Sequence, residues 1–104
     1  MSGIAILALA SNVDKYIHRF IGLAKEVGEC FSSHHLFIHE SDSIDGTRSL
    51  LRGYASHDWI DVICENGLRK RFPHETWRLA HARQVLLDKL VASNFKPALV
   101  LVFD

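Results

Sequence analysis

The sequence predicts an α/β fold, a Rossmann-like three-layer sandwich whose four strands form a mostly parallel sheet. Four short apolar runs, each of strand length, alternate with three segments of helical periodicity. Connections of this kind give parallel strands with helices on both faces of the sheet. The chain has 104 residues, enough for one hydrophobic core and too few for two. We therefore expect a single domain over residues 1–104 with the order β-α-β-α-β-α-β.

The first half of the chain contains two predicted strands and two predicted helices. Ile4–Ala10 is a continuous apolar run, which is typical of a strand covered on both faces. Ser11 follows it as a candidate N-cap for an amphipathic helix. The second strand is expected at His34–Glu40, and Asp45 is a good N-cap for a second helix over Gly46–Ala55.

The second half of the chain repeats this alternation. Trp59–Glu65 predicts a third strand, and an Asn-Gly turn then leads into Leu68–Phe72, which we interpret as a basic loop. A proline precedes a long helix over His74–Ser93. A fourth apolar strand is expected at Ala98–Phe103, directly before Asp104.

Composition and motif searches exclude several classes of function. Twelve basic and twelve acidic residues give a formal net charge of zero, which argues against a nucleic-acid or anionic-membrane surface. The longest apolar run is too short to span a bilayer, and no positive charge precedes it as in a signal peptide, so a cytoplasmic location is the default expectation. The seven histidines are not spaced as metal ligands. A Gly-x-Gly-x-x-Gly motif is also absent, which disfavours a dinucleotide oxidoreductase.

Acidic residues follow two of the predicted strands. In open α/β sheets, ligands bind outside the carboxyl ends of the strands. Glu40 ends the second strand and should point into this crevice, where its carboxylate can accept hydrogen bonds from a ribose or a base. Asp42 and Asp45 follow, and they also have simpler interpretations as a solvated loop residue and a helix cap. Asp104 ends the strand expected beside the first, a usual place for a ligand of magnesium or manganese.

One arginine breaks the apolar pattern of the long helix. Arg83 projects from the middle of the apolar stripe, between Leu79 and Leu87. A guanidinium on a buried face is costly unless an anion pairs with it. Two interpretations remain open. Arg83 either forms an internal salt bridge to Asp45 or Glu40 or reaches the end of the sheet, or it faces the crevice and holds an acidic ligand.

Three segments carry a family resemblance. Glu-Ser-Asp-Ser-Ile-Asp-Gly-Thr at 40–47 resembles the motif that follows the second strand of GT-A-fold glycosyltransferases. Trp-Arg-Leu-Ala-His-Ala-Arg-Gln at 77–84 resembles their helix motif with Ala-Arg-Asn at its centre, and 98–104 resembles the strand that delivers their Asp-x-Asp metal motif. The combination is most similar to the fungal-capsule-type α-1,3-mannosyltransferases, and it covers nearly the whole chain.

The resemblance implies a nucleotide-sugar donor, a UDP- or GDP-sugar, and a carbohydrate or glycan acceptor. Asp104 takes the first acidic position of Asp-x-Asp, whose manganese or magnesium ion offsets the pyrophosphate charge as the leaving group departs. Arg83 lies near the diphosphate of the donor in such enzymes. The residues that the resemblance assigns to the nucleotide sugar are Leu9, Ala10, Ser11, Glu40, Asp45 and Arg83.

Two departures from the family pattern shape the expectation. Gln84 stands where the family commonly has asparagine, and the second acid of Asp-x-Asp is absent because the sequence stops at Asp104. We therefore expect the donor-binding half of a glycosyltransferase, truncated at this motif, without the acceptor-binding half and the catalytic base. The last strand is expected to leave an open sheet edge. The alternatives are a small non-catalytic α/β interaction module and an inactive remnant.

Overall fold

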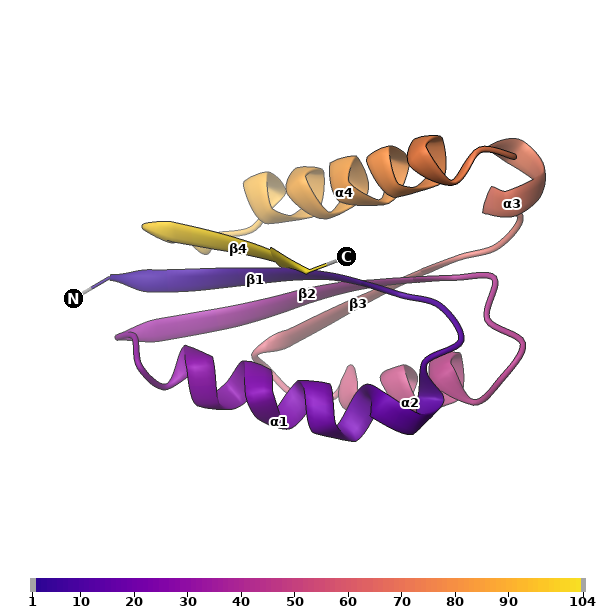
Figure 1. Ribbon diagram of the computed structural model, residues 1–104. Helices are drawn as coiled ribbons and strands as arrows, with labels where there is room; N and C mark the ends of the chain where they lie inside the picture. The colour runs from indigo at the N-terminus through magenta and orange to yellow at the C-terminus, as the bar shows by residue number, and fades with distance from the viewer. Residues whose placement is uncertain (1, 104) are drawn as a thin grey trace.

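The computed structural model describes residues 2–103, and it confirms the predicted α/β fold. The strands are β1 (Gly3–Ala10), β2 (Ser33–Ser41), β3 (Ile60–Glu65) and β4 (Leu99–Phe103). The helices are η1 (Asp14–Tyr16, a 3-10 turn), α1 (Ile17–Gly28), α2 (Thr47–Tyr54), α3 (Leu68–Arg71) and α4 (Glu75–Ala92). The sheet order is β3-β2-β1-β4 and all neighbouring strands are parallel. Figure 1 shows α4 over one face, and α1 and α2 over the other.

The core lies on both sides of the central strand β1. Its alternate side chains point to opposite faces, as the period of a strand requires. Ile4, Ile6 and Ala8 pack in the cluster beneath α1 and α2, while Ala5 and Leu7 pack beneath α4. All five are at most 3% exposed. The continuous apolar run therefore predicted a strand covered on both faces correctly.

Two local predictions are wrong, because residues far away in the sequence decide them. The hydroxyl of Ser11 caps no helix and instead donates to the backbone oxygen of Ser41 at 2.8 Å. The expected basic loop contains the short helix α3, which follows Gly67 in a left-handed conformation (φ 77°). The carboxylate of Asp42 accepts the backbone N–H groups of Gly67 and Arg69, at 2.6 and 3.1 Å, and so supports this turn from outside.

The buried stripe of α4 is narrower than predicted. Ala82, Leu86 and Leu90 are buried, whereas Leu87, which the predicted stripe included, is exposed, and so is Val91. α4 packs mainly on β1 and β2 and leaves β4 largely uncovered. None of the helices within residues 2–103 is long and apolar enough to cross a membrane.

Candidate ligand-binding site

A cavity of about 310 Å³ opens at the carboxyl ends of β1 and β2, on the side of α4. Its volume lies at the lower end of the range for small-molecule sites. Residues Leu9, Ala10 and Ser11, assigned by resemblance to the nucleotide sugar, line it together. The remaining lining residues are Val13, His39, Ser41, Arg69, Glu75, Arg78, Leu79 and Ala82.

The two loops that border this cavity are bound to each other. Beyond the Ser11 bond, the side-chain oxygen of Asn12 accepts the N–H of Ile44 at 2.8 Å, and the hydroxyl of Thr47 accepts the N–H of Val13 at 2.8 Å. Asn12 adopts a left-handed conformation (φ 54°), which asparagine tolerates better than most residues. These side chains satisfy backbone groups that loops otherwise leave to water. The edge of the cavity is therefore held in place before any ligand binds.

Asp45 belongs to this loop framework. One carboxylate oxygen accepts both the N–H and the hydroxyl of Thr47, at 2.9 and 2.6 Å. The prediction that Asp45 is the N-cap of the second helix is wrong, because α2 begins at Thr47 with Gly46 as its N-cap residue, and Asp45 instead forms a local turn with Thr47. The other carboxylate oxygen of Asp45 accepts the N–H of Asp14 at 3.2 Å. These bonds, chiefly the one from the Thr47 hydroxyl, hold the pKa of Asp45 below its usual value. Asp45 does not line the cavity.

Glu40 ends β2 as predicted, but its carboxylate does not face the crevice. The side chain is fully buried (0% exposed) and lies 2.6 Å from Arg48 Nε, while its second oxygen accepts the N–H of Ser43 at 2.9 Å. Burial alone raises the pKa of Glu40, yet the bonds from Arg48 and Ser43 outweigh it and leave the pKa lowered. Because Arg48 also donates to the backbone oxygen of Glu65 at 3.1 Å, the pair fastens α2 to the ends of β2 and β3.

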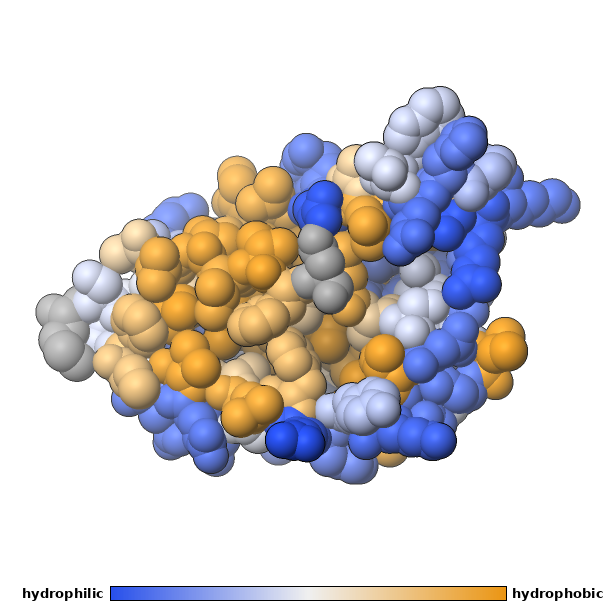
Figure 2. Space-filling model, viewed as in Figure 1, coloured by the Kyte–Doolittle hydropathy of each residue, from blue (hydrophilic) through white to orange (hydrophobic). Residues whose placement is uncertain are grey.

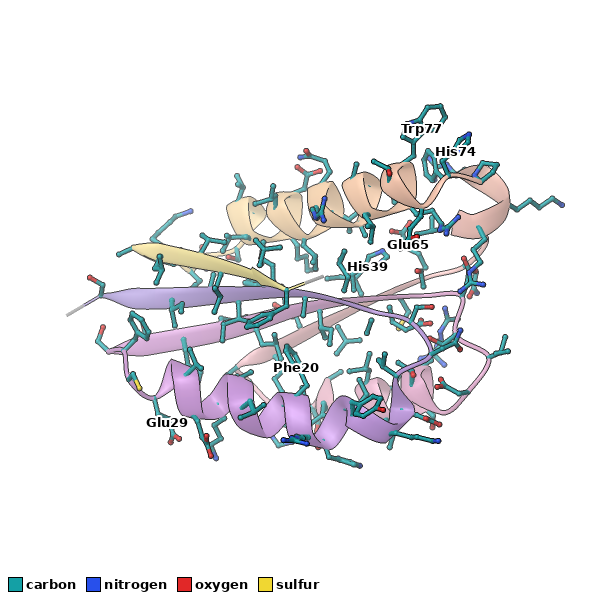
Figure 3. All side chains as sticks on the ribbon, viewed as in Figure 1. Phe20, Glu29, His39, Glu65, His74 and Trp77 are labelled. Carbon is teal, nitrogen blue, oxygen red and sulfur yellow. The ribbon has the colours of Figure 1, made fainter. Side chains whose placement is uncertain are left out.

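Two histidines share one carboxylate beside the cavity. Figure 3 shows His39 and Glu65 between the sheet and the start of α4. His39 Nε2 lies 2.7 Å from Glu65 Oε1, and His81 Nε2 lies 3.1 Å from the same oxygen. A carboxylate only accepts hydrogen bonds, so each ring carries a proton on Nε2. Burial raises the pKa of Glu65, but the two imidazoles lower it by more.

His39 is the member of this cluster that reaches the cavity. It is 1% exposed and still lines the cavity wall. With Nε2 bonded to Glu65, its ring orientation is fixed by a partner on the next strand. A buried, oriented imidazole at a cavity wall is suited to recognising a hydroxyl or a base edge of a ligand.

The charges around the cavity favour an anionic ligand. Arg69 and Arg78 contribute two guanidinium groups, and Glu75 contributes the one carboxylate of the lining. Arg78 donates to the backbone oxygens of Phe72 and Pro73, at 3.0 and 2.9 Å, which anchors it beside the start of α4. The planar fork of donors on an arginine matches the geometry of phosphate and carboxylate groups.

The remaining predicted residues lie beside this cavity or outside the described part of the chain. Arg83 is partly exposed on α4, one residue after the buried Ala82, and it does not line the cavity. The prediction that it projects from the middle of a buried stripe is wrong, because the exposed Leu87 lies one turn further on the same flank. Asp104 lies outside residues 2–103. Within that range no three His, Cys, Asp or Glu side chains are grouped so that they could hold a metal ion.

Sequence reasoning missed five polar residues of this region: His39, Arg48, Glu65, Arg69 and Arg78. One signal was present, because Glu40 and Glu65 both end predicted strands and parallel strands bring such ends together. The register pairs Ser41 with Glu65. The partners on α3 and α4 had no comparable signal, since their positions depend on how the helices pack.

Comparisons with protein-family models, with curated proteins and with solved structures find no match to this chain.

Proposed function

We propose that this domain binds a nucleotide-diphosphate sugar as the donor-binding part of a GT-A-type glycosyltransferase. The observation that supports the proposal is the cavity at the carboxyl ends of β1 and β2, which brings Leu9, Ala10 and Ser11 opposite Arg69 and Arg78. Apolar side chains from the strand end and from α4 suit a nucleobase, while the arginines suit the phosphates. The volume of the cavity fits the nucleoside part of the donor better than the whole nucleotide sugar.

The roles within the proposed site follow the geometry. Leu9, Ala10 and Ser11 form the nucleoside wall, His39 recognises a hydroxyl or base edge, and Arg69 holds a phosphate oxygen. Glu40 and Asp45 act on the donor indirectly, by fixing the loops that border the cavity. The hydrogen bonds between Asp45 and Thr47 support this assignment.

A divalent metal and a transferred hexose extend the proposal. The resemblance gives Asp104 as the residue that would hold manganese or magnesium, and such an ion would supply charge that offsets the pyrophosphate. The donor that the resemblance implies is a UDP- or GDP-sugar, and the acceptor is a carbohydrate or glycan.

Isothermal titration calorimetry tests the proposal. The chain is titrated with UDP, GDP, UDP-glucose and GDP-mannose, with and without manganese, and we expect saturable binding of at least one of them. Arg69→Ala should weaken that binding about tenfold, the equivalent of about 1.4 kcal/mol for one lost phosphate contact. Lys70→Ala is the matched control, because Lys70 is exposed on the same short helix and does not line the cavity.

Two results count against the proposal. A chain that unfolds cooperatively but gives no heat with any nucleotide or sugar nucleotide contradicts it. Equal weakening by Arg69→Ala and Lys70→Ala also contradicts it, since binding then depends on general positive charge and not on the cavity.

A further inference from the structure

The strand β4 forms an open and apolar edge of the sheet. It pairs with β1, and within residues 2–103 no strand pairs with its other side. Four of its five side chains, Leu99, Val100, Val102 and Phe103, are 40–49% exposed. The strand carries no charged residue, although charges are the usual protection of an edge against pairing with another chain.

Two helices extend this apolar surface above and below the strand. On α1, Leu23 and Val27 each precede a buried residue by one position and are exposed. On α4, Leu87 and Val91 each follow a buried residue by one position and are exposed as well. Figure 2 shows the resulting apolar patch, which spreads from β4 towards both helices. We call β4 and these two helix flanks the β4 face.

The β4 face is large enough for a stable interface. Its exposed side chains present an apolar area on the order of 700 Å² per copy, against about 800 Å² per partner in a standard protein interface. An exposed apolar patch of this size is unusual on a monomer and marks an interaction site.

We propose that the β4 face binds a second copy of this chain, with the two β4 strands antiparallel and joined into one eight-stranded sheet. A two-fold axis through Leu101 places Leu99 of each copy opposite Phe103 of the other, and Val100 opposite Val102. Every cross-strand pair is then apolar. The same axis brings both α1 flanks to one side of the joined sheet and both α4 flanks to the other, so the surface is self-complementary.

Charge also favours a copy of this chain as the occupant. The formal net charge is zero, so two copies approach without net repulsion. The opposite edge of the sheet, β3, carries Asp61 with a side chain that is 44% exposed, and it is thereby protected against the same pairing. One edge pairs and the other does not, which gives a closed dimer and not a growing fibre. The β4 face shares no residue with the lining of the cavity.

Sedimentation equilibrium of the full 104-residue chain tests the dimer. We expect a monomer–dimer equilibrium that Val102→Lys shifts at least tenfold towards the monomer, because the substitution puts a charge on the pairing edge. Ile44→Lys is the matched control, because Ile44 is 94% exposed in a loop away from the β4 face. This substitution should leave the monomer–dimer equilibrium unchanged. A wild-type chain that stays monomeric at every concentration, or assembles beyond the dimer, overturns the proposal. Equal dissociation by both variants overturns it too.

Cross-linking tests the register without relying on a charged variant. In a chain with Cys30 and Cys64 replaced by serine, Leu101→Cys should form an intermolecular disulfide, because the axis places the two cysteines opposite each other. Leu99→Cys should not, because its partner is Phe103. Cross-linking through position 99 and not 101 overturns the antiparallel arrangement.

Discussion

The two halves of the sheet differ in the side chains at their strand ends. At the β2–β3 half, polar side chains at the strand ends are paired: Glu40 with Arg48, and Glu65 with His39 and His81. At the β1–β4 half, the strand ends are apolar, and β4 exposes most of its side chains. The difference teaches that the polar side chains of the first half find their partners within the chain, whereas the apolar side chains of β4 are left exposed.

The largest expected effect comes from breaking the buried pair in the polar half. Arg48→Met leaves the fully buried carboxylate of Glu40 without its cation, and an uncompensated buried charge costs about 3–5 kcal/mol. Urea unfolding measures this loss. Arg52→Met, an exposed arginine on the same helix, is the control and should change the free energy of unfolding little. Equal losses in the two variants would show that the pair does not hold the strand ends.

A smaller effect is expected at Asp42, which links the polar half to the cavity. Asp42→Ala removes the acceptor for Gly67 and Arg69 and should cost about 1–2 kcal/mol of stability. It should also weaken nucleotide binding several-fold, because α3 carries Arg69. Asp42→Asn tolerates the left-handed backbone (φ 51°) but keeps only one of the two acceptor oxygens, so calorimetry should find a smaller loss of binding than in Asp42→Ala. Loss of binding in the asparagine variant alone would contradict this role.

The smallest effect is a dependence of stability on acidic pH. The pKa values of Glu40, Asp42 and Glu65 are lowered by their hydrogen bonds, which outweigh the effect of burial. A lowered pKa in the folded chain means that stabilisation is complete above the ordinary glutamate value of 4.5 and is lost as the pH falls below it. Glu65→Gln should lose about 1 kcal/mol at pH 7 and show a shallower decline in acid. Thermal unfolding between pH 3 and 7 measures both, and an unchanged acid slope would contradict the assignment.

Periodicity was enough to predict the architecture, because each strand and helix carries its own apolar pattern. Ile4–Ala10 and Trp59–Glu65 show this most directly: the structure places β1 and β3 within one residue of those limits. Leu68–Phe72 was misread because Asp42, a residue 25 positions before Gly67, supports the turn of α3. Secondary-structure propensity depends on residues that are close in the sequence, so it does not predict contacts between residues that are far apart in the sequence.

The sequence predicted the location of the candidate site, but only some of the residues that line it. Topology put the crevice at the carboxyl ends of the strands, and Ser11 lies there. Glu40 also lies at a strand end, but Arg48 occupies its carboxylate, and that pairing depends on the packing of α2. A carboxylate at a strand end can therefore serve the loops and not the ligand. In Glu40 the carboxylate serves the loops because the nearby Arg48 pairs with it.

Nuclear magnetic resonance mapping of a bound sugar nucleotide is the most direct measurement of what the cavity does. Titration of the isotope-labelled chain with GDP-mannose or UDP-glucose should shift the amide signals of Ser11, Ser41 and Arg69, which border the cavity. The amide of Gly53, on the exposed side of α2, should stay unchanged. Shifts confined to the β4 face, or no shifts at saturating nucleotide, would contradict a donor site in this cavity.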